Sequence, residues 1–168
     1  ERSSLKVISE PEPDGREIAL THNSLKILKK IGVWDFIDEA DVSPLKEAKV
    51  FDGDSDALLN FDTNKSSIEA LGYLVPNYLI RRALFKKAAQ IVNVTIQYDV
   101  SVEDVKTSSN VANIVLSNKM TIKSKLIVAA DSRFSEIRRK MGVPSMIKDF
   151  SKVMIIARVS HENSHNQT

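Results

Sequence analysis

Apolar and polar positions in the first part of the chain predict a strand, a loop and a helix in that order. An apolar strand is expected at residues 5–8 (LKVI), and two prolines followed by Asp-Gly predict a loop at residues 10–17. Residues 21–24 (THNS) offer N-cap candidates for a helix, which Gly32 can end in a left-handed conformation. The helical spacing comes from Ile27, Leu28, Ile31 and Trp34. A short helical turn is expected directly afterwards, in the stretch WDFIDEA.

The middle of the chain combines a β-hairpin with a second helix. Residues 47–52 and 57–62 are strand-like and flank the turn Gly-Asp-Ser-Asp, which predicts a hairpin. Asn77 follows Pro76 as an N-cap candidate and begins an amphipathic helix. The positions expected on its buried face are Ile80, Ala83, Leu84, Lys87, Ala88 and Ile91.

The last part of the chain is mostly strand-like. Residues 126–130 (LIVAA) are apolar on both faces, as expected of a strand buried between two layers, and a helix should begin near Ser135. A final strand is expected at residues 153–159. Before these elements, antiparallel strands joined by short turns are predicted within 94–108, 111–118 and 120–125. Strand–helix units mixed with an antiparallel meander predict an α/β, or mixed α+β, protein.

Composition narrows the classes of function. The 168 residues suggest about one domain or parts of two. With 24 basic and 22 acidic side chains, the net charge of +2 gives no reason to expect nucleic-acid binding. The absence of cysteine excludes disulfides, thiolate catalysis and Cys-ligated metals. No apolar run approaches the ~20 residues of a membrane span. A cytoplasmic location is therefore expected.

Asp131 is the first candidate functional residue, because it ends the apolar stretch 126–130 directly before a helix. Ligands of open α/β sheets bind beyond the carboxyl ends of strands, often beside a helix N-terminus. A carboxylate there can accept hydrogen bonds from ribose or ribityl hydroxyls. Aspartate is also a common helix cap, and the residues alone leave the two interpretations equally favoured.

The wider string LIVAADSRFSEIRR resembles the "DG" fingerprint of flavoprotein aromatic hydroxylases, which places Asp131, Ser135 and Arg138 at the cofactor. Ser132 stands where that family has glycine, a residue that permits a positive φ and close backbone approach. The stretch from Asp14 to Trp34 resembles the family's D-x-R-x-x-A-L segment, in which the arginine, here Arg16, reaches the flavin pyrophosphate.

The stretch GYLVPNYLIRRAL resembles a third family segment, in which Asn77 occupies the position of an amide that contacts the flavin, with Arg81 one turn further on. Alternatives from the residues alone are a solvated loop arginine for Arg16 and a helix cap for Asn77. Residues 150–165 resemble a strand found in the polyprenylphenol hydroxylases of ubiquinone biosynthesis.

The resemblance implies the central part of an FAD-dependent monooxygenase that hydroxylates the aromatic ring of a polyprenylphenol. It implies FAD, O₂, NAD(P)H or another electron donor, and possible attachment to the inner membrane or to a biosynthetic complex. The implied fold is an incomplete Rossmann-like FAD-binding domain with a meander, plus part of a β-sheet substrate domain. The FAD-binding part would be residues 1–43 and 70–148, and the substrate part residues 44–69 and 149–168. These residues alone are expected to be inactive, and none of them is assigned a catalytic role.

Two stretches resemble metal-binding motifs, but no metal site is expected. His161 to His165 spells HExxH, but it follows a β-patterned stretch instead of lying on a helix. Asp52 to Asp56 alternates acids as an EF-hand does, but Thr63 stands where the bidentate glutamate should be. The alternatives that remain are a different flavoprotein aromatic hydroxylase and a non-catalytic α/β module in which Arg16 and Asp131 are structural.

Overall fold

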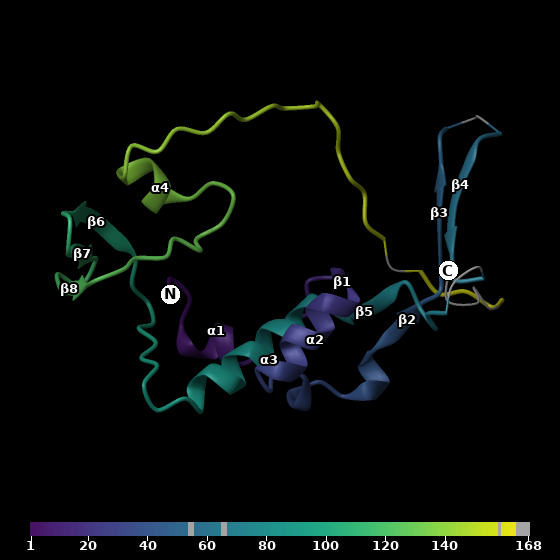
Figure 1. The fold of residues 1–168 in the computed structure, drawn as a ribbon, viewed down its shortest axis with the longest axis horizontal. Coiled ribbons are helices and arrows are strands. Elements are labelled where there is room, and N and C mark those ends of the chain that lie inside the picture. Colours follow the sequence, from purple (N-terminus) through teal and green to yellow (C-terminus); the bar gives the residue numbers. More distant parts are fainter. Residues whose placement is uncertain (54–55, 65–66, 158, 164–168) are drawn as a thin grey trace. The chain divides into compact units, whose positions relative to one another are not determined.

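The computed structural model describes residues 1–53, 56–64, 67–157 and 159–163. The chain forms two compact units. The meander unit comprises Glu1–Leu5 and Ile96–Met154, and the sheet–helix unit comprises Lys6–Thr95 with the described residues from Ile155 onward. Figure 1 shows the elements of both units along the chain.

An antiparallel three-stranded sheet organises the sheet–helix unit. Its strands are β1 (Glu17–Leu20), β2 (Ser43–Leu45) and β5 (Gly72–Pro76), with β5 in the middle. In the register of β1 with β5, Glu17 lies opposite Pro76. Pro76 lies at the end of β5, where its missing N–H interrupts no central hydrogen bond. The sheet therefore ends where the next helix begins.

The helix α2 (His22–Lys30) confirms the prediction for that segment. The Thr21 side chain accepts a hydrogen bond from the backbone N–H of Ser24 at 3.2 Å, which satisfies a donor that the helix leaves unpaired. Gly32 has a φ of +69°, as a left-handed helix end requires. The expected helical turn is present as η1 (Trp34–Phe36), and η2 (Glu39–Asp41) follows it.

The helix α3 (Asn77–Ala89) covers the sheet with a narrower face than the one predicted: Ala83 is buried and Ile80 packs against the core, as expected. Leu79 and Ala83 are its buried residues, whereas Leu84 and Ile91 are 42% and 41% exposed. The predicted face was too wide because the helix packs at one edge against η1 and β5. The core that it closes consists of Leu20, Val33, Ile37, Val75 and Ala83.

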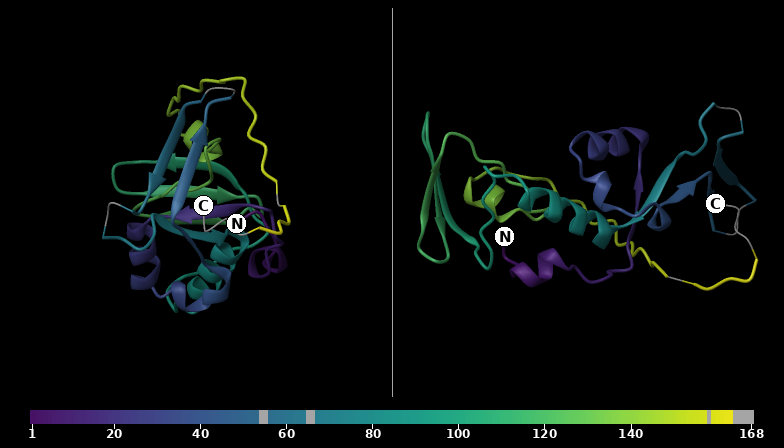
Figure 2. Two further views of the ribbon diagram at one scale, coloured as in Figure 1. Left: turned by 90° about the vertical axis from the view of Figure 1, so that its right-hand side faces the viewer. Right: turned by 90° about the horizontal axis from the view of Figure 1, so that it is seen from below.

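The predicted hairpin is confirmed as β3 (Glu47–Phe51) paired with β4 (Leu58–Asp62). Val50 lies opposite Leu59, and Ala48 lies opposite Phe61. Because directly opposed residues share a face, these four side chains form one apolar face of the hairpin. Figure 2 shows the two long strands in two further views.

The meander unit contains the three predicted antiparallel strands, β6 (Val102–Thr107), β7 (Ala112–Leu116) and β8 (Thr121–Ser124). Val105, Ala112 and Leu116 are buried residues of these strands. The helix α4 (Glu136–Lys140) follows, with Ser135 as its N-cap, and it contacts β6. The predicted helix start near Ser135 is therefore confirmed.

Three predicted strands are wrong. Residues 5–8 belong to the helix α1 (Leu5–Ser9), which has no buried residue. Residues 126–130 form no strand, and Leu126 and Val128 are 77% and 75% exposed. The described part of 153–159 is not a strand either. A strand needs a hydrogen-bonded neighbour, and no strand of the described residues pairs with any of these segments.

Helices and antiparallel sheets occur together, which confirms the mixed α/β class. Within the described residues no helix has both the length and the apolar character needed to cross a membrane.

Candidate functional site

Asp14 joins two of the predicted cofactor-binding residues of the sheet–helix unit. Its Oδ2 atom accepts hydrogen bonds from Arg16 Nε at 3.0 Å, from Arg16 Nη2 at 2.5 Å and from Asn77 Nδ2 at 2.6 Å. Its Oδ1 atom accepts the backbone N–H of Arg16 at 3.2 Å. Arg16 and Asn77 are therefore brought together, with one carboxylate between them.

The sheet places these residues side by side although they are far apart in sequence. The backbone N–H of Asn77 donates to the carbonyl of Arg16 at 2.9 Å, which continues the pairing of β1 with β5 by one step. Gly15 has a φ of +69°, so the loop can turn sharply between Asp14 and Arg16. The helix-cap alternative for Asn77 is wrong, because Pro76 occupies the cap position and the Asn77 side chain binds Asp14.

The electrostatics of this cluster favour a fully ionised pair. Hydrogen bonds from the side chains of Arg16 and Asn77 lower the pKa of Asp14 from 3.8 to about 2. Asp14 is therefore charged at neutral pH, and Arg16 carries its permanent positive charge. The Arg16 side chain is 57% exposed. Its guanidinium has five N–H donors, and the bonds to the Asp14 carboxylate occupy only part of them. The remaining guanidinium N–H groups are available to an oxyanion.

Asp131 and Ser135 form a second cluster, in the meander unit. Asp131 Oδ2 accepts the backbone N–H of Ile137 at 3.1 Å, and Ser135 Oγ accepts that of Arg138 at 3.0 Å. A hydrogen bond from the Ser135 hydroxyl, together with that from Ile137, lowers the pKa of Asp131. The cap interpretation of Asp131 thus describes part of its bonding, because the carboxylate satisfies a free N–H group of α4.

Two further residues of the predicted fingerprint have clear positions. Ser132 has a φ of +97°, so the position where the family has glycine does adopt the left-handed conformation. Arg138 donates from Nη1 to the carbonyl of Val143 at 2.9 Å, which ties it to the loop after α4. Arg138 therefore has a structural partner of its own.

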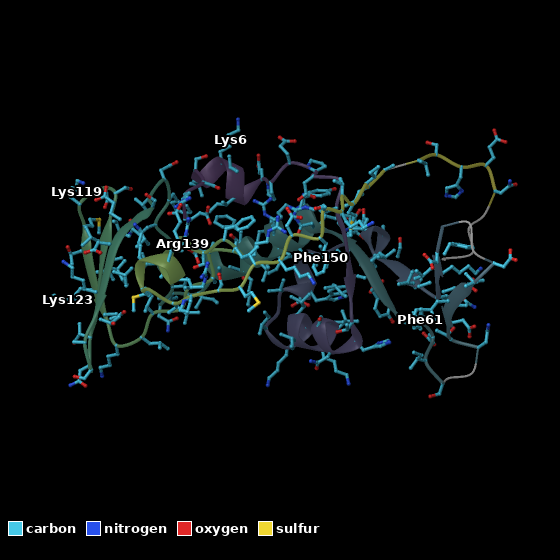
Figure 3. All side chains as sticks on the ribbon, turned by 90° about the horizontal axis from the view of Figure 1, so that it is seen from above. Lys6, Phe61, Lys119, Lys123, Arg139 and Phe150 are labelled. Carbon is cyan, nitrogen blue, oxygen red and sulfur yellow. The ribbon has the colours of Figure 1, made fainter. Side chains whose placement is uncertain are left out.

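A cavity of about 660 Å³ lies beside α4 in the meander unit. Asp131 and Ser132 line it, whereas Ser135 and Arg138 do not. Sequence reasoning missed three other lining residues, Arg2, Phe134 and Arg139. Arg2 forms an ion pair with Glu136, a contact between residues far apart in sequence that no local pattern reveals. Figure 3 shows the labelled Arg139 on α4, and its place in the run Arg138–Lys140 was the available signal.

The five predicted residues fall into two groups. Arg16 and Asn77 lie in the sheet–helix unit, and Asp131, Ser135 and Arg138 lie in the meander unit. Arg81, the neighbour of Asn77 on α3, is exposed.

No cluster of metal-ligating side chains occurs among the residues that the structure describes. His165 of the HExxH string lies outside the described residues, as do Asp54 and Ser55 of the acidic turn.

A family model described as an FAD binding domain matches residues 6–166. Ubiquinone hydroxylase UbiM of Neisseria meningitidis is 43% identical over 172 residues, which cover 100% of this chain and 37% of the relative. Ubiquinone hydroxylase UbiL of Rhodospirillum rubrum is 26% identical, with coverage of 90% and 35%. The 3-demethoxyubiquinol 3-hydroxylase of Escherichia coli is 24% identical, with coverage of 93% and 40%. The chain thus spans 35% to 40% of the length of these relatives.

Solved structures share the fold at low sequence identity. A mutant of PqsL from Pseudomonas aeruginosa has a TM-score of 0.68 and 17% identity, with coverage of 89% of this chain and 40% of that chain. The p-nitrophenol 4-monooxygenase PnpA from Pseudomonas putida has a TM-score of 0.65 and 17% identity, with coverage of 84% and 36%. These likenesses confirm the predicted aromatic hydroxylase fold.

Proposed function

Because this chain belongs to the FAD binding domain family, we propose that the whole protein is an FAD-dependent monooxygenase of ubiquinone biosynthesis. Its substrates would be O₂ and a polyprenylated phenol, whose aromatic ring it hydroxylates. The observation that carries the proposal is the 43% identity to a ubiquinone hydroxylase along the entire chain. FAD, when bound, supplies the redox chemistry with O₂ that a protein side chain cannot supply, with NAD(P)H or another donor as the reductant.

The sheet–helix cluster fits a phosphate of the cofactor. A guanidinium binds oxyanions through several parallel N–H groups, and Arg16 is half-exposed with part of its donors unused. Asn77 stands beside it on the first turn of α3. We assign Arg16 to the pyrophosphate and Asn77 to a neighbouring polar group of FAD.

The meander-unit cluster fits a sugar or ribityl chain. The cavity beside α4 has the size of ordinary ligand pockets, which are roughly 300–1,000 Å³. Asp131 is ionised on its wall and can accept hydrogen bonds from hydroxyl groups. Ser135 and Arg138 act indirectly in this proposal, because Ser135 bonds to Asp131 and to the first turn of α4, and Arg138 bonds to the loop after α4.

The assignment of residues to an FAD-binding domain and a substrate domain is also part of the proposal. Residues 1–43 and 70–148 would bind FAD, and residues 44–69 and 149–168 would belong to the substrate domain. The apolar face of the hairpin β3–β4 supports the second assignment, because a polyprenylphenol is largely apolar. A polyprenyl substrate resides in membranes, so peripheral attachment to the inner membrane or to a biosynthetic complex is proposed with it.

The test uses the full-length protein that contains this chain. Purified protein should retain FAD, recognised by its visible absorption, and should consume NAD(P)H and O₂ when a prenylated phenol is added. Mass spectrometry should show a product with one added oxygen atom. Protein that stays colourless after incubation with FAD would overturn the proposal, and a flavin-loaded protein that hydroxylates only unprenylated phenols would point to a different aromatic hydroxylase.

Asp131 offers a direct test of the cofactor site. Asp131→Asn should weaken FAD retention about tenfold, because a neutral amide oxygen accepts hydroxyl hydrogen bonds more weakly than a charged carboxylate does. The dissociation constant is measured by flavin fluorescence titration of the apoprotein.

Asp104→Asn is the matched control for Asp131→Asn, because it makes the same change at an aspartate of β6 that lies in the same unit but outside the cavity lining. Equal losses in both variants would mean that the effect of Asp131→Asn does not come from the cavity.

A further inference from the structure

Asp14 is the one carboxylate in the described chain that bonds two predicted cofactor-binding side chains at once. The backbone places Asp14 next to both side chains. Gly15 turns the loop between Asp14 and Arg16, and the sheet register fixes Arg16 beside Asn77. The Asp14 side chain is 23% exposed, much less than the 57% of Arg16. Asp14 accepts hydrogen bonds from both side chains, so its carboxylate is the group that joins Arg16 to Asn77.

The bonding pattern fixes the orientation of the guanidinium plane. Asp14 Oδ2 takes one hydrogen bond from Nε and one from Nη2, so rotation about the end of the side chain is restricted. An exposed arginine without such a partner samples many rotamers, and ordering them costs binding free energy. Holding Arg16 in one orientation before a ligand arrives removes part of that cost.

The charge of Asp14 acts in the opposite direction. A carboxylate within hydrogen-bonding distance of Arg16 offsets part of the positive potential that an anionic ligand would experience. If this effect dominated, removal of the negative charge would strengthen the binding of an anion. The sign of the change in affinity therefore distinguishes positioning from repulsion.

We propose that Asp14 is a positioning residue for the cofactor: it holds the Arg16 guanidinium in place for the pyrophosphate of FAD, through a carboxylate that also bonds the Asn77 amide. The inference rests on the proposed function, since it assumes that Arg16 binds FAD. Asp14 itself does not touch the cofactor in this arrangement.

A double-mutant cycle in the full-length apoprotein tests the proposal, with the FAD dissociation constant as the readout. Asp14→Asn should raise that constant about tenfold when Arg16 is present, and less than about twofold in the Arg16→Gln background. Asp14→Glu keeps the charge but moves the carboxylate by one methylene, so it should also weaken binding. Asp35→Asn, an exposed aspartate of the same unit, is the control and should change nothing.

The outcomes separate this inference from the proposed function. If Arg16→Gln leaves FAD binding unchanged, the assignment of Arg16 to the cofactor is wrong, and the inference is overturned with it. If Arg16→Gln weakens binding but Asp14→Asn does not, or strengthens it, only the positioning role is wrong. Equal effects of Asp14→Asn in both backgrounds would mean that Asp14 acts independently of Arg16.

Discussion

At the scale of single residues, Ser132 shows that backbone conformation can be read from a motif even where the residue type departs from it. The resemblance predicted a glycine-like position, and the structure gives Ser132 a φ of +97°. A β-carbon makes that conformation costly, by roughly 1 kcal/mol or more. Two hydrogen bonds hold the turn: Ser132 Oγ accepts the N–H of Phe134 at 3.4 Å, and its carbonyl accepts that of Ser135 at 3.1 Å.

Ser132→Gly should therefore stabilise the protein by about 0.5–1 kcal/mol, because the relief of strain exceeds the added flexibility of the unfolded chain. Chemical denaturation of the full-length protein measures the change. Ser117→Gly, at a serine without a positive φ, should destabilise instead, and a loss of stability in both variants would contradict the strain.

The lowered pKa of Asp14 leads to a prediction of how the stability of the protein depends on pH. Its folded-state pKa of about 2 lies below the value of roughly 3.9 expected in the unfolded chain. Between these values the unfolded state binds more protons, so the contribution of Asp14 is complete above about pH 4 and is lost as the pH falls toward 2. Thermal melting between pH 6 and pH 3 should show a smaller acid-induced decrease for Asp14→Asn than for the unchanged protein.

The residue scale also shows what sequence alone could not assign. Asp14 stands within the D-x-R segment, yet its role appears only when Asn77, distant in the chain, joins Arg16 at the same carboxylate. Asp131 was predicted with its two alternatives, and its bond to Ile137 depends on the local turn that the motif specifies. Local bonds were thus within reach of prediction, and bonds between distant segments were not.

At the scale of elements, the sequence best predicted the helices and hairpins that are stabilised by residues close together in the chain. The helix α2 with its Thr21 cap and the hairpin β3–β4 both carry their signals within a short stretch. The strand predicted at residues 126–130 is absent. Apolar character shows that a segment can be buried, but not which strand will pair with it. The same reason applies to residues 5–8, where a short helix formed instead.

Gly72 leaves no room for a side chain in the three-stranded sheet. A β-carbon at this position would lie 2.6 Å from the carbonyl oxygen of Leu20, a backbone atom that cannot move without disturbing β1. Gly72→Ala should destabilise the full-length protein by about 1–3 kcal/mol, as overpacking does elsewhere. Urea denaturation measures the loss.

Ser43→Ala, an exposed position on the neighbouring β2, is the control for Gly72→Ala and should stay within about 0.5 kcal/mol. An unchanged midpoint for Gly72→Ala would show that β1 and β5 can separate without cost.

At the scale of the whole molecule, many large apolar side chains are exposed. Val50, Leu59 and Phe61 on one face of the hairpin are 54%, 55% and 50% exposed. A two-stranded hairpin is at best marginally stable by itself, so such a face needs a covering partner. Since the relatives are much longer than this chain, further segments of the whole protein can supply that cover.

The isolated 168-residue chain should therefore bind a hydrophobic dye such as ANS more strongly, per mole, than the full-length protein, and should self-associate. It should also fail to hydroxylate a prenylated phenol. Fluorescence titration and size-exclusion chromatography make the comparison. A monomeric isolated chain without dye binding would show that these surfaces are covered within the chain itself.

The junction of β5 with α3 has a consequence for insertions and deletions. Strand and helix follow each other without a loop, and the Asn77 N–H is bonded to Arg16 across the sheet. One residue added or lost between Tyr73 and Asn77 would shift the register of β5 by one position, reverse the faces of its side chains and carry the Asn77 amide away from Asp14. Changes of length during evolution should therefore gather in the turn between β3 and β4, and homologous chains should keep the spacing from Gly72 to Asn77 constant.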